Sequence, residues 1–268
     1  MWSRMFLPHR GRWQPDGLTE GAFAARSPSG ASRHLPRGGR GLVAAFLLLA
    51  ACRETPTEPT FPDAGRDVAP VVSDRFSTEE ARDRIGEAEQ VMALAGVKAG
   101  MSVADVGAGE GYYTVRLARA VGPRGRVLAE DIDPNVIDGL GDRIQRERLD
   151  HVAVKLGTPT DPMLPARSFD RIFLVHMFHE VTEPYAFLWH LREGVKPGGE
   201  VILVDSDRPV KSHGIPPKQA DCEFRALGLT PIRSATLEGG DSYFRAYRVA
   251  RERPEPRAIK PCTDKPGN

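Results

Sequence analysis

The segment Val103-Ala-Asp-Val-Gly-Ala-Gly-Glu-Gly-Tyr112 gives the first indication of the fold. An apolar strand ends in a Gly-x-Gly-x-Gly turn, and Tyr113 to Ala120 then has the composition of a helix. A second apolar segment, Arg126 to Glu130, leads to Asp131, twenty residues after the last glycine. Glycines in such a turn let the backbone approach a ligand, and an acid after the second strand can accept ribose hydroxyls. This order of elements predicts a nucleoside site.

Two classes of nucleoside ligand compete for this site, a dinucleotide such as NAD and S-adenosylmethionine. The dinucleotide fingerprint is G-x-G-x-x-G, with a pyrophosphate at the helix start. Here Tyr112 stands where the third glycine of that fingerprint would be. Asp105, two residues before the first glycine, would repel a pyrophosphate but suits a sulfonium and an α-ammonium group. Charge therefore favours S-adenosylmethionine, with an NAD-dependent oxidoreductase as the weaker alternative.

Four segments in chain order resemble motifs of class I S-adenosylmethionine-dependent methyltransferases: Val103–Ala118, Val127–Pro134, Ser168–Val175 and Val195–Asp205. The resemblance covers roughly residues 77 to 250 and implies transfer of a methyl group to an unidentified, small-molecule or other acceptor. It also implies that Asp105 lies near the methionine end of the cofactor and that Asp131 holds the ribose. The residues that it places along the border of the cofactor are Gly107, Gly109 and Gly111.

Strands alternate with helices along this region, which predicts a parallel sheet. The last two strands, about Thr230 to Thr236 and Ser242 to Val249, are joined by Glu238-Gly-Gly-Asp241, a hairpin signal. We therefore expect an α/β, Rossmann-like fold of seven mostly parallel strands with a C-terminal antiparallel hairpin and helices on both faces, as the resemblance also implies. Before the first strand, Ser77 and Glu80 have the spacing of a capping box, followed by one helix with an apolar face.

Polar residues follow other strands at the edge where open α/β sheets bind ligands. The resemblance places Asp161, after the third strand, near the adenine amine. It places His176 and His179, after the fourth strand, beside the methyl group and the acceptor. An imidazole there can remove a proton from the acceptor, and we expect His179 to lie at the methyl-transfer cavity with His176 as an equally good neighbour. The alternative is that His176 packs at the strand end and that His179 and Glu180 cap the next helix.

Metal chemistry has little support in the sequence. His176, His179 and Glu180 resemble metal ligands in type, but the chain shows no further ligand cluster beside them. His213, after the fifth strand, is a further candidate for a catalytic base, although an ordinary loop histidine is the safer interpretation. The sequence therefore predicts no metal site.

The overall charge bears on partners. The chain has 268 residues, 37 basic and 36 acidic, for a formal net charge of +1. This balance gives no electrostatic footprint for nucleic acid. The oligomeric state cannot be read from the sequence.

The N-terminal region has a different composition. Residues 1–40 contain seven arginines and two acids, and Gly41 to Ala51 is apolar or small, too short for a bilayer span of about 20 residues. A basic segment, a short apolar core and small residues before a cut site are typical of a secretory signal. Leu49-Ala-Ala-Cys52 resembles the lipobox of bacterial lipoproteins, which implies that Cys52 is acylated and holds the protein on a membrane.

These features divide the chain into a leader and signal (1–51), a Pro-rich tether (52–76), a methyltransferase domain (77–250) and a flexible tail (251–268). Localisation in the cell envelope conflicts with a cofactor made in the cytoplasm. Two alternatives therefore stay open: a cytoplasmic enzyme, and an exported nucleoside-binding module without catalysis. In an exported domain Cys222 and Cys262 can form a disulfide, whereas free thiols are the alternative.

Overall fold

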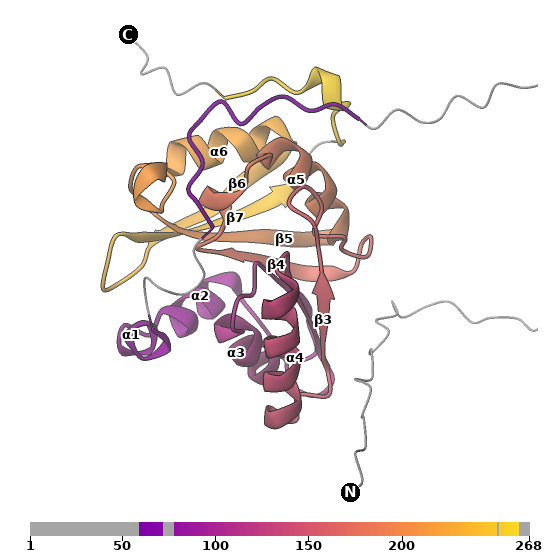
Figure 1. Ribbon diagram of the computed structural model, residues 1–268, viewed down its shortest axis with the longest axis vertical. Coiled ribbons are helices and arrows are strands. Elements are labelled where there is room, and N and C mark those ends of the chain that lie inside the picture. The colour runs from indigo at the N-terminus through magenta and orange to yellow at the C-terminus, as the bar shows by residue number, and fades with distance from the viewer. Residues whose placement is uncertain (1–58, 72–77, 251, 263–268) are drawn as a thin grey trace, which may run out of the picture. The chain divides into compact units, whose positions relative to one another are not determined.

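The computed structural model describes residues 59–71, 78–250 and 252–262 (Figure 1). The expected leader, the lipobox and Cys52 lie outside the described residues. Among the helices that are described, none has the length and apolar character needed to cross a bilayer.

A seven-stranded sheet forms the centre of the domain, with the strand order β3-β2-β1-β4-β5-β7-β6. Strands β1 to β5 run parallel, and β7 pairs antiparallel with both β5 and β6. The expected Rossmann-like fold with a C-terminal antiparallel hairpin is confirmed. The strands are β1 (Ser102–Val106), β2 (Arg126–Asp131), β3 (Val152–Leu156), β4 (Phe169–Val175), β5 (Val195–Ser206), β6 (Leu229–Thr236) and β7 (Ser242–Val249).

Helices cover both faces of the sheet, as Figure 1 shows. Side chains of α5 (Pro184–Leu191) and α6 (Pro217–Ala226) pack into one apolar core, and those of α2 (Glu87–Ala95) and α3 (Tyr112–Val121) into another. Helix α4 (Pro134–Glu147) packs on β2 and β3. Because both faces of the central strands are covered, their sequences are continuously apolar rather than alternating, as in Val201 to Val204 of β5, all 0 % exposed.

The helical region before β1 differs from the expectation of one helix capped by Ser77. It forms two helices, α1 (Glu79–Arg84) and α2, separated at Gly86, whose φ is 61°. The side chain of Thr78, one residue after the expected cap, accepts the amide hydrogen of Ala81 and so caps α1. The left-handed residue turns the chain between the helices, and Ile85 just before it is 36 % exposed.

Residues 59–71 and 252–262, which the sequence places in the tether and the tail, pack on the domain. The amide of Ala69 donates to the carbonyl of His179, and Arg66 forms a buried ion pair with Glu223 of α6 at 2.7 Å. Cys262 is buried and forms a disulfide with Cys222 of α6. The pairing that the sequence left open is therefore formed in the structure.

Candidate functional site

The turn after β1 has the backbone that its glycines predict. Gly107, Gly109 and Gly111 have φ of 69°, 54° and 88°, in the region that residues with a Cβ rarely adopt. A Cβ on Gly107 would lie 2.8 Å from Cγ of Met177, in the loop after β4, and one on Gly111 would lie 2.4 Å from Leu140 of α4. At two of the three positions a Cβ would therefore force a neighbouring side chain to shift, in addition to the strain of the positive φ.

Asp131 connects this turn to the end of β2. Its Oδ2 accepts the amide hydrogen of Gly109 at 3.0 Å, and its Oδ1 accepts that of Asp133, also at 3.0 Å. Each oxygen keeps a further lone pair that can accept a ligand hydroxyl. The expected ribose-binding residue therefore lies directly against the glycine turn.

Four carboxyl groups gather at the same edge of the sheet, and one of them, Glu130, was missed from the sequence. Burial and the neighbouring charges of Asp131, Asp161 and Asp105 raise the pKa of Glu130 well above its ordinary value, against a hydrogen bond from Gly107 that lowers it. Within the described residues, Oε1 of Glu130 is buried without a hydrogen-bond partner. Two adjacent acids at the end of one strand were the signal for a second carboxyl here.

Asp105 is buried on β1 beneath the turn. Its Oδ2 accepts the hydroxyl hydrogen of Thr114, from α3, at 2.6 Å. Burial raises the pKa of Asp105 to about 6, although the Thr114 hydrogen bond and the charge of Arg82 lower it and that of Asp131 raises it. A carboxylate in this position gains stability when a cation binds near it.

Asp161 reaches the site from a turn after β3. Its amide and carbonyl bond to Thr158, and its Oδ1 accepts the amide hydrogen of Met163 at 2.6 Å. Oδ2 lies 3.6 Å from Nδ1 of His190 on α5. The carboxyl lies near enough to Glu130 to influence its pKa, so it shares the edge that holds the glycine turn. Its contact with the adenine amine stays a prediction.

This donor set fits S-adenosylmethionine better than a dinucleotide. The carboxyl groups at the turn accept hydrogen bonds from hydroxyl and amine groups, and they favour a cationic sulfonium and an α-ammonium group nearby. A pyrophosphate would add two negative charges to a region that already raises the pKa of its own acids. The bound cofactor supplies a methyl group on a good leaving group, and the protein's part is to align donor and acceptor and to exclude water.

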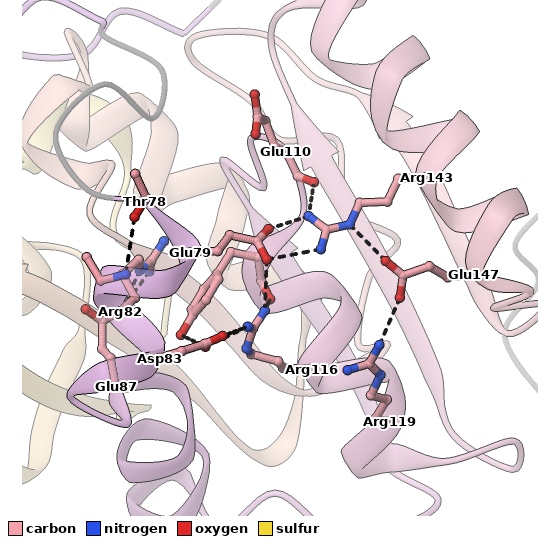
Figure 2. A network of polar contacts seen from close by, with 12 residues as sticks. Thr78, Glu79, Arg82, Asp83, Glu87, Glu110, Arg116, Arg119, Arg143 and Glu147 are labelled. Carbon is pink, nitrogen blue, oxygen red and sulfur yellow. Dashed lines mark hydrogen bonds and ion pairs between the residues drawn. The ribbon is translucent and has the colours of Figure 1, made fainter.

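Helix α1 is held over the glycine turn by a network of arginines and acids (Figure 2). Arg143 of α4 donates both to Glu79 of α1 and to the backbone carbonyl of Glu110, inside the turn, at 2.8 Å. Arg116 of α3 pairs with Asp83 of α1 at 2.6 Å. These contacts join the turn to three helices and so restrict its conformation before a ligand binds.

Glu87, at the start of α2, ties His176 to this scaffold. Nε2 of His176 lies 3.2 Å from Oε2 of Glu87, while Oε1 accepts hydrogen bonds from Arg82 and from the hydroxyl of Tyr113. Burial raises the pKa of Glu87, but the hydrogen bond from His176 and the charges of His176 and Arg82 outweigh it and lower the pKa to about 2. The expected neighbour of the acceptor therefore has a definite partner on α2.

His179 is also placed by a carboxylate. It lies in the short 3₁₀ turn Phe178–Glu180 after β4 and is 3 % exposed. Nδ1 lies 2.9 Å and 3.0 Å from the two oxygens of Asp205, a fully buried residue near the end of β5. The Asp205 carboxylate accepts a hydrogen bond from Nδ1–H and so leaves Nε2 as the atom available for chemistry. Asp205 is the last residue of the fourth motif segment, and sequence reasoning did not pair it with His179.

Comparison with known proteins points to the same chemistry. Residues 103–199 match a family model described as a methyltransferase domain. The chain is 26 % identical over 182 residues to the ubiquinone/menaquinone biosynthesis C-methyltransferase UbiE of Hahella chejuensis, covering 64 % of this chain and 68 % of that protein. It is 27 % identical over 121 residues to the demethylmenaquinone methyltransferase of Geobacillus sp. strain WCH70, covering 45 % of this chain and 52 % of that protein, about half its length.

Among solved structures, the S-adenosylmethionine-dependent methyltransferase of Aquifex aeolicus superposes with a TM-score of 0.58 at 26 % identity, covering 62 % of this chain and 91 % of that one. The family match spans the first three of the four motif segments and the start of the fourth. The domain described by the structure is therefore a class I S-adenosylmethionine-dependent methyltransferase domain.

Proposed function

We propose that the whole chain is an S-adenosylmethionine-dependent methyltransferase that acts on a small-molecule acceptor while anchored to a membrane through Cys52. The cluster of Asp105, Glu130, Asp131 and Asp161 around the glycine turn carries the first half of this proposal, because it favours a cationic nucleoside ligand. The acceptor side is the edge beyond β4, where Met177 touches the turn and His179 follows two residues later.

We assign the acceptor to the class indicated by the two relatives reported above, whose names refer to ubiquinone or menaquinone. A quinone precursor is apolar and resides in a bilayer, so a lipid-anchored enzyme would meet it at the membrane surface. The leader and Leu49-Ala-Ala-Cys52 support the anchor. The Cys222–Cys262 disulfide supports export, because disulfides persist in oxidising compartments.

Titration calorimetry of the purified full chain tests the cofactor assignment. S-adenosylmethionine and S-adenosylhomocysteine should bind with one site per chain, and NAD should not bind. NAD binding without binding of either adenosyl ligand would favour the oxidoreductase. Binding without methyl transfer to demethylmenaquinone or any other quinone precursor would favour the non-catalytic binding module.

Expression with labelled palmitate in a Gram-negative host tests the anchor. The wild-type protein should incorporate the label and sediment with membranes, and Cys52→Ser should lose the label. A protein that keeps its first 51 residues and stays in the cytoplasm would refute export. These results do not depend on the calorimetry, so the two halves of the proposal fail separately.

A further inference from the structure

Three potential metal ligands meet at the ends of β4 and β5. His179 and Glu180 follow β4, and His213 follows β5 in the loop after the 3₁₀ turn Val210–Ser212. One ligand atom of each side chain lies within 4.8 Å of the other two. His179 is buried and the other two are partly exposed, so the cluster is fixed on one side and accessible on the other.

Nε2 is the ring nitrogen of His179 that faces the other two potential ligands. Its Nδ1 is taken by Asp205, and Nε2 lies 3.9 Å from Oε1 of Glu180. That same oxygen lies 3.9 Å from Nδ1 of His213. Ligands about 2.1 Å from a tetrahedral metal lie about 3.4 Å from one another. Each of these two pairs therefore needs to close by only about half an ångström, which rotations of partly exposed side chains can supply.

The backbone holds His213 in this place at some cost. Its φ is 55°, a left-handed conformation that is uncommon for residues other than glycine. The following Gly214 passes so close to β5 that a Cβ would lie 2.5 Å from the carbonyl oxygen of Ser206. The amide of Ile215 donates to that same carbonyl. The loop thus folds back on the end of β5 and brings His213 over His179, with ring centroids 5.7 Å apart.

We propose that His179, Glu180 and His213 bind a first-row divalent transition-metal ion of the Zn²⁺ class. Two imidazoles and one carboxylate form a ligand set that Zn²⁺ uses in sites with a position left open for water or substrate. Asp205 has the role of the carboxylate that accepts the other ring N–H of a metal-bound histidine, fixing the tautomer and raising the basicity of the ligand. If Asp205 and His179 formed only a structural pair, neither Glu180 nor His213 would need to lie beside them.

The location of the cluster suggests a role for such an ion in activating the methyl acceptor, and this role rests on the proposed function. The cluster follows β4 and β5, and β4 pairs with β1, whose glycine turn touches Met177. A hydroxyl oxygen of the acceptor that occupies the open position would lose its proton more readily, because a bound metal lowers the pKa of a coordinated oxygen acid. The proton would leave to water, and the electron pair so released, on the oxygen or on a ring carbon conjugated with it, would form the bond to the methyl carbon as the bond from that carbon to the sulfonium sulfur breaks and S-adenosylhomocysteine leaves. A ring carbon that accepts the methyl group would then lose its own proton to water.

Metal binding to the purified full chain, treated with a chelator and dialysed against Zn²⁺, tests the site directly. Elemental analysis should find one Zn²⁺ per wild-type chain, with a Kd of micromolar or below, and Zn²⁺ should raise the Tm. His213→Ala and Glu180→Gln should each weaken binding by 100-fold or more and remove the rise in Tm. Asp205→Asn should weaken it by about 10- to 100-fold.

His190→Ala is the matched control, because this half-buried histidine on α5 lies outside the cluster. It should bind Zn²⁺ as the wild type does, and the disulfide already excludes Cys222 and Cys262 as free thiolate ligands. No uptake at tens of micromolar Zn²⁺, or uptake unchanged in His213→Ala and Glu180→Gln, would overturn the proposal. Binding of S-adenosylhomocysteine, measured on the same samples, reports the proposed function separately and should be unaffected by His213→Ala.

Discussion

The amide of Gly109 donates a hydrogen bond to Oδ2 of Asp131 at 3.0 Å, so the turn after β1 is tied to the end of β2. The other oxygen of the same carboxylate accepts the amide hydrogen of Asp133 at the start of α4. Asp131 therefore organises two backbone segments in addition to the ribose contact expected of it. A neutral residue without an acceptor would disturb both segments before any ligand arrives.

Asp131→Ala should weaken the binding of S-adenosylhomocysteine by about 1–3 kcal/mol, because ribose hydroxyls and the Gly109 amide lose their acceptor. Calorimetry measures the change. The control is Asp133→Ala, which removes the cap that Asp133 provides for the amide of Asn135. It should cost about 1 kcal/mol of stability with little loss of affinity. Equal affinity losses in the two folded variants would contradict a specific role for Asp131.

The disulfide should stabilise the domain without controlling cofactor affinity. Cys222→Ser combined with Cys262→Ser opens a loop of 40 residues and should lower the free energy of unfolding by about 2–4 kcal/mol. Chemical denaturation of the variant beside the wild type measures this. Cofactor affinity should stay within about twofold, because Cys222 belongs to α6, which packs against β6 and α5 rather than against the glycine turn. A large loss of affinity would show that the tail supports the site.

The sheet could be predicted from sequence because its signals are local. Apolar runs, glycine turns and the Glu238 to Asp241 hairpin mark the strands. The bounds expected for the last two strands, 230–236 and 242–249, lie within one residue of the observed β6 and β7. The prediction of one helix before β1 was wrong because of Gly86, a single glycine inside a helical pattern. In its left-handed conformation this residue separates two helices. Its effect depends on α2 packing under α3, which periodicity alone does not show.

Only the part of the candidate site whose residues belong to one sequence motif could be predicted. The glycines and Asp131 lie in one short unit, so their proximity follows from that unit. Glu87 meets His176 across 89 residues, and Asp205 meets His179 across 26. His213 joins His179 only because Gly214 lets the loop fold back on β5. Such pairs depend on strand order and loop path, which no local spacing encodes.

Glu87→Gln should destabilise the domain in a pH-dependent way. The pKa of Glu87 is lowered to about 2, so the stability that its charge contributes is complete above its ordinary value of 4.5 and is lost as the pH falls from there toward 2. The variant should be less stable at pH 7 by up to about 3 kcal/mol, with the difference shrinking below pH 4. The exposed Glu89→Gln on the same helix should behave like the wild type. A constant difference at all pH values would indicate a packing effect.

Asp105 should oppose stability at neutral pH. Its pKa in the folded protein is about 6, above the ordinary 3.8, so the folded state holds this proton more tightly than the unfolded chain does. The stability that the proton contributes is complete below pH 3.8 and is lost as the pH rises through about 6. Asp105→Asn, which can still accept the Thr114 hydroxyl hydrogen, should therefore be more stable than the wild type at pH 8, by up to about 3 kcal/mol.

The same charge should favour the cofactor. A sulfonium and an α-ammonium group near Asp105 stabilise its ionised form, so the affinity for S-adenosylmethionine should increase as the pH rises through about 6. In Asp105→Asn the affinity for S-adenosylmethionine should be lower than in the wild type at pH 8, and it should not increase as the pH rises through about 6. Calorimetry and denaturation from pH 4.5 to 8 measure both effects, with the exposed Asp138→Asn on α4 as the control. If Asp105→Asn lost stability at pH 8, or kept the full pH-dependence of binding, Asp105 would not be the buried acid that faces the cationic end of the cofactor.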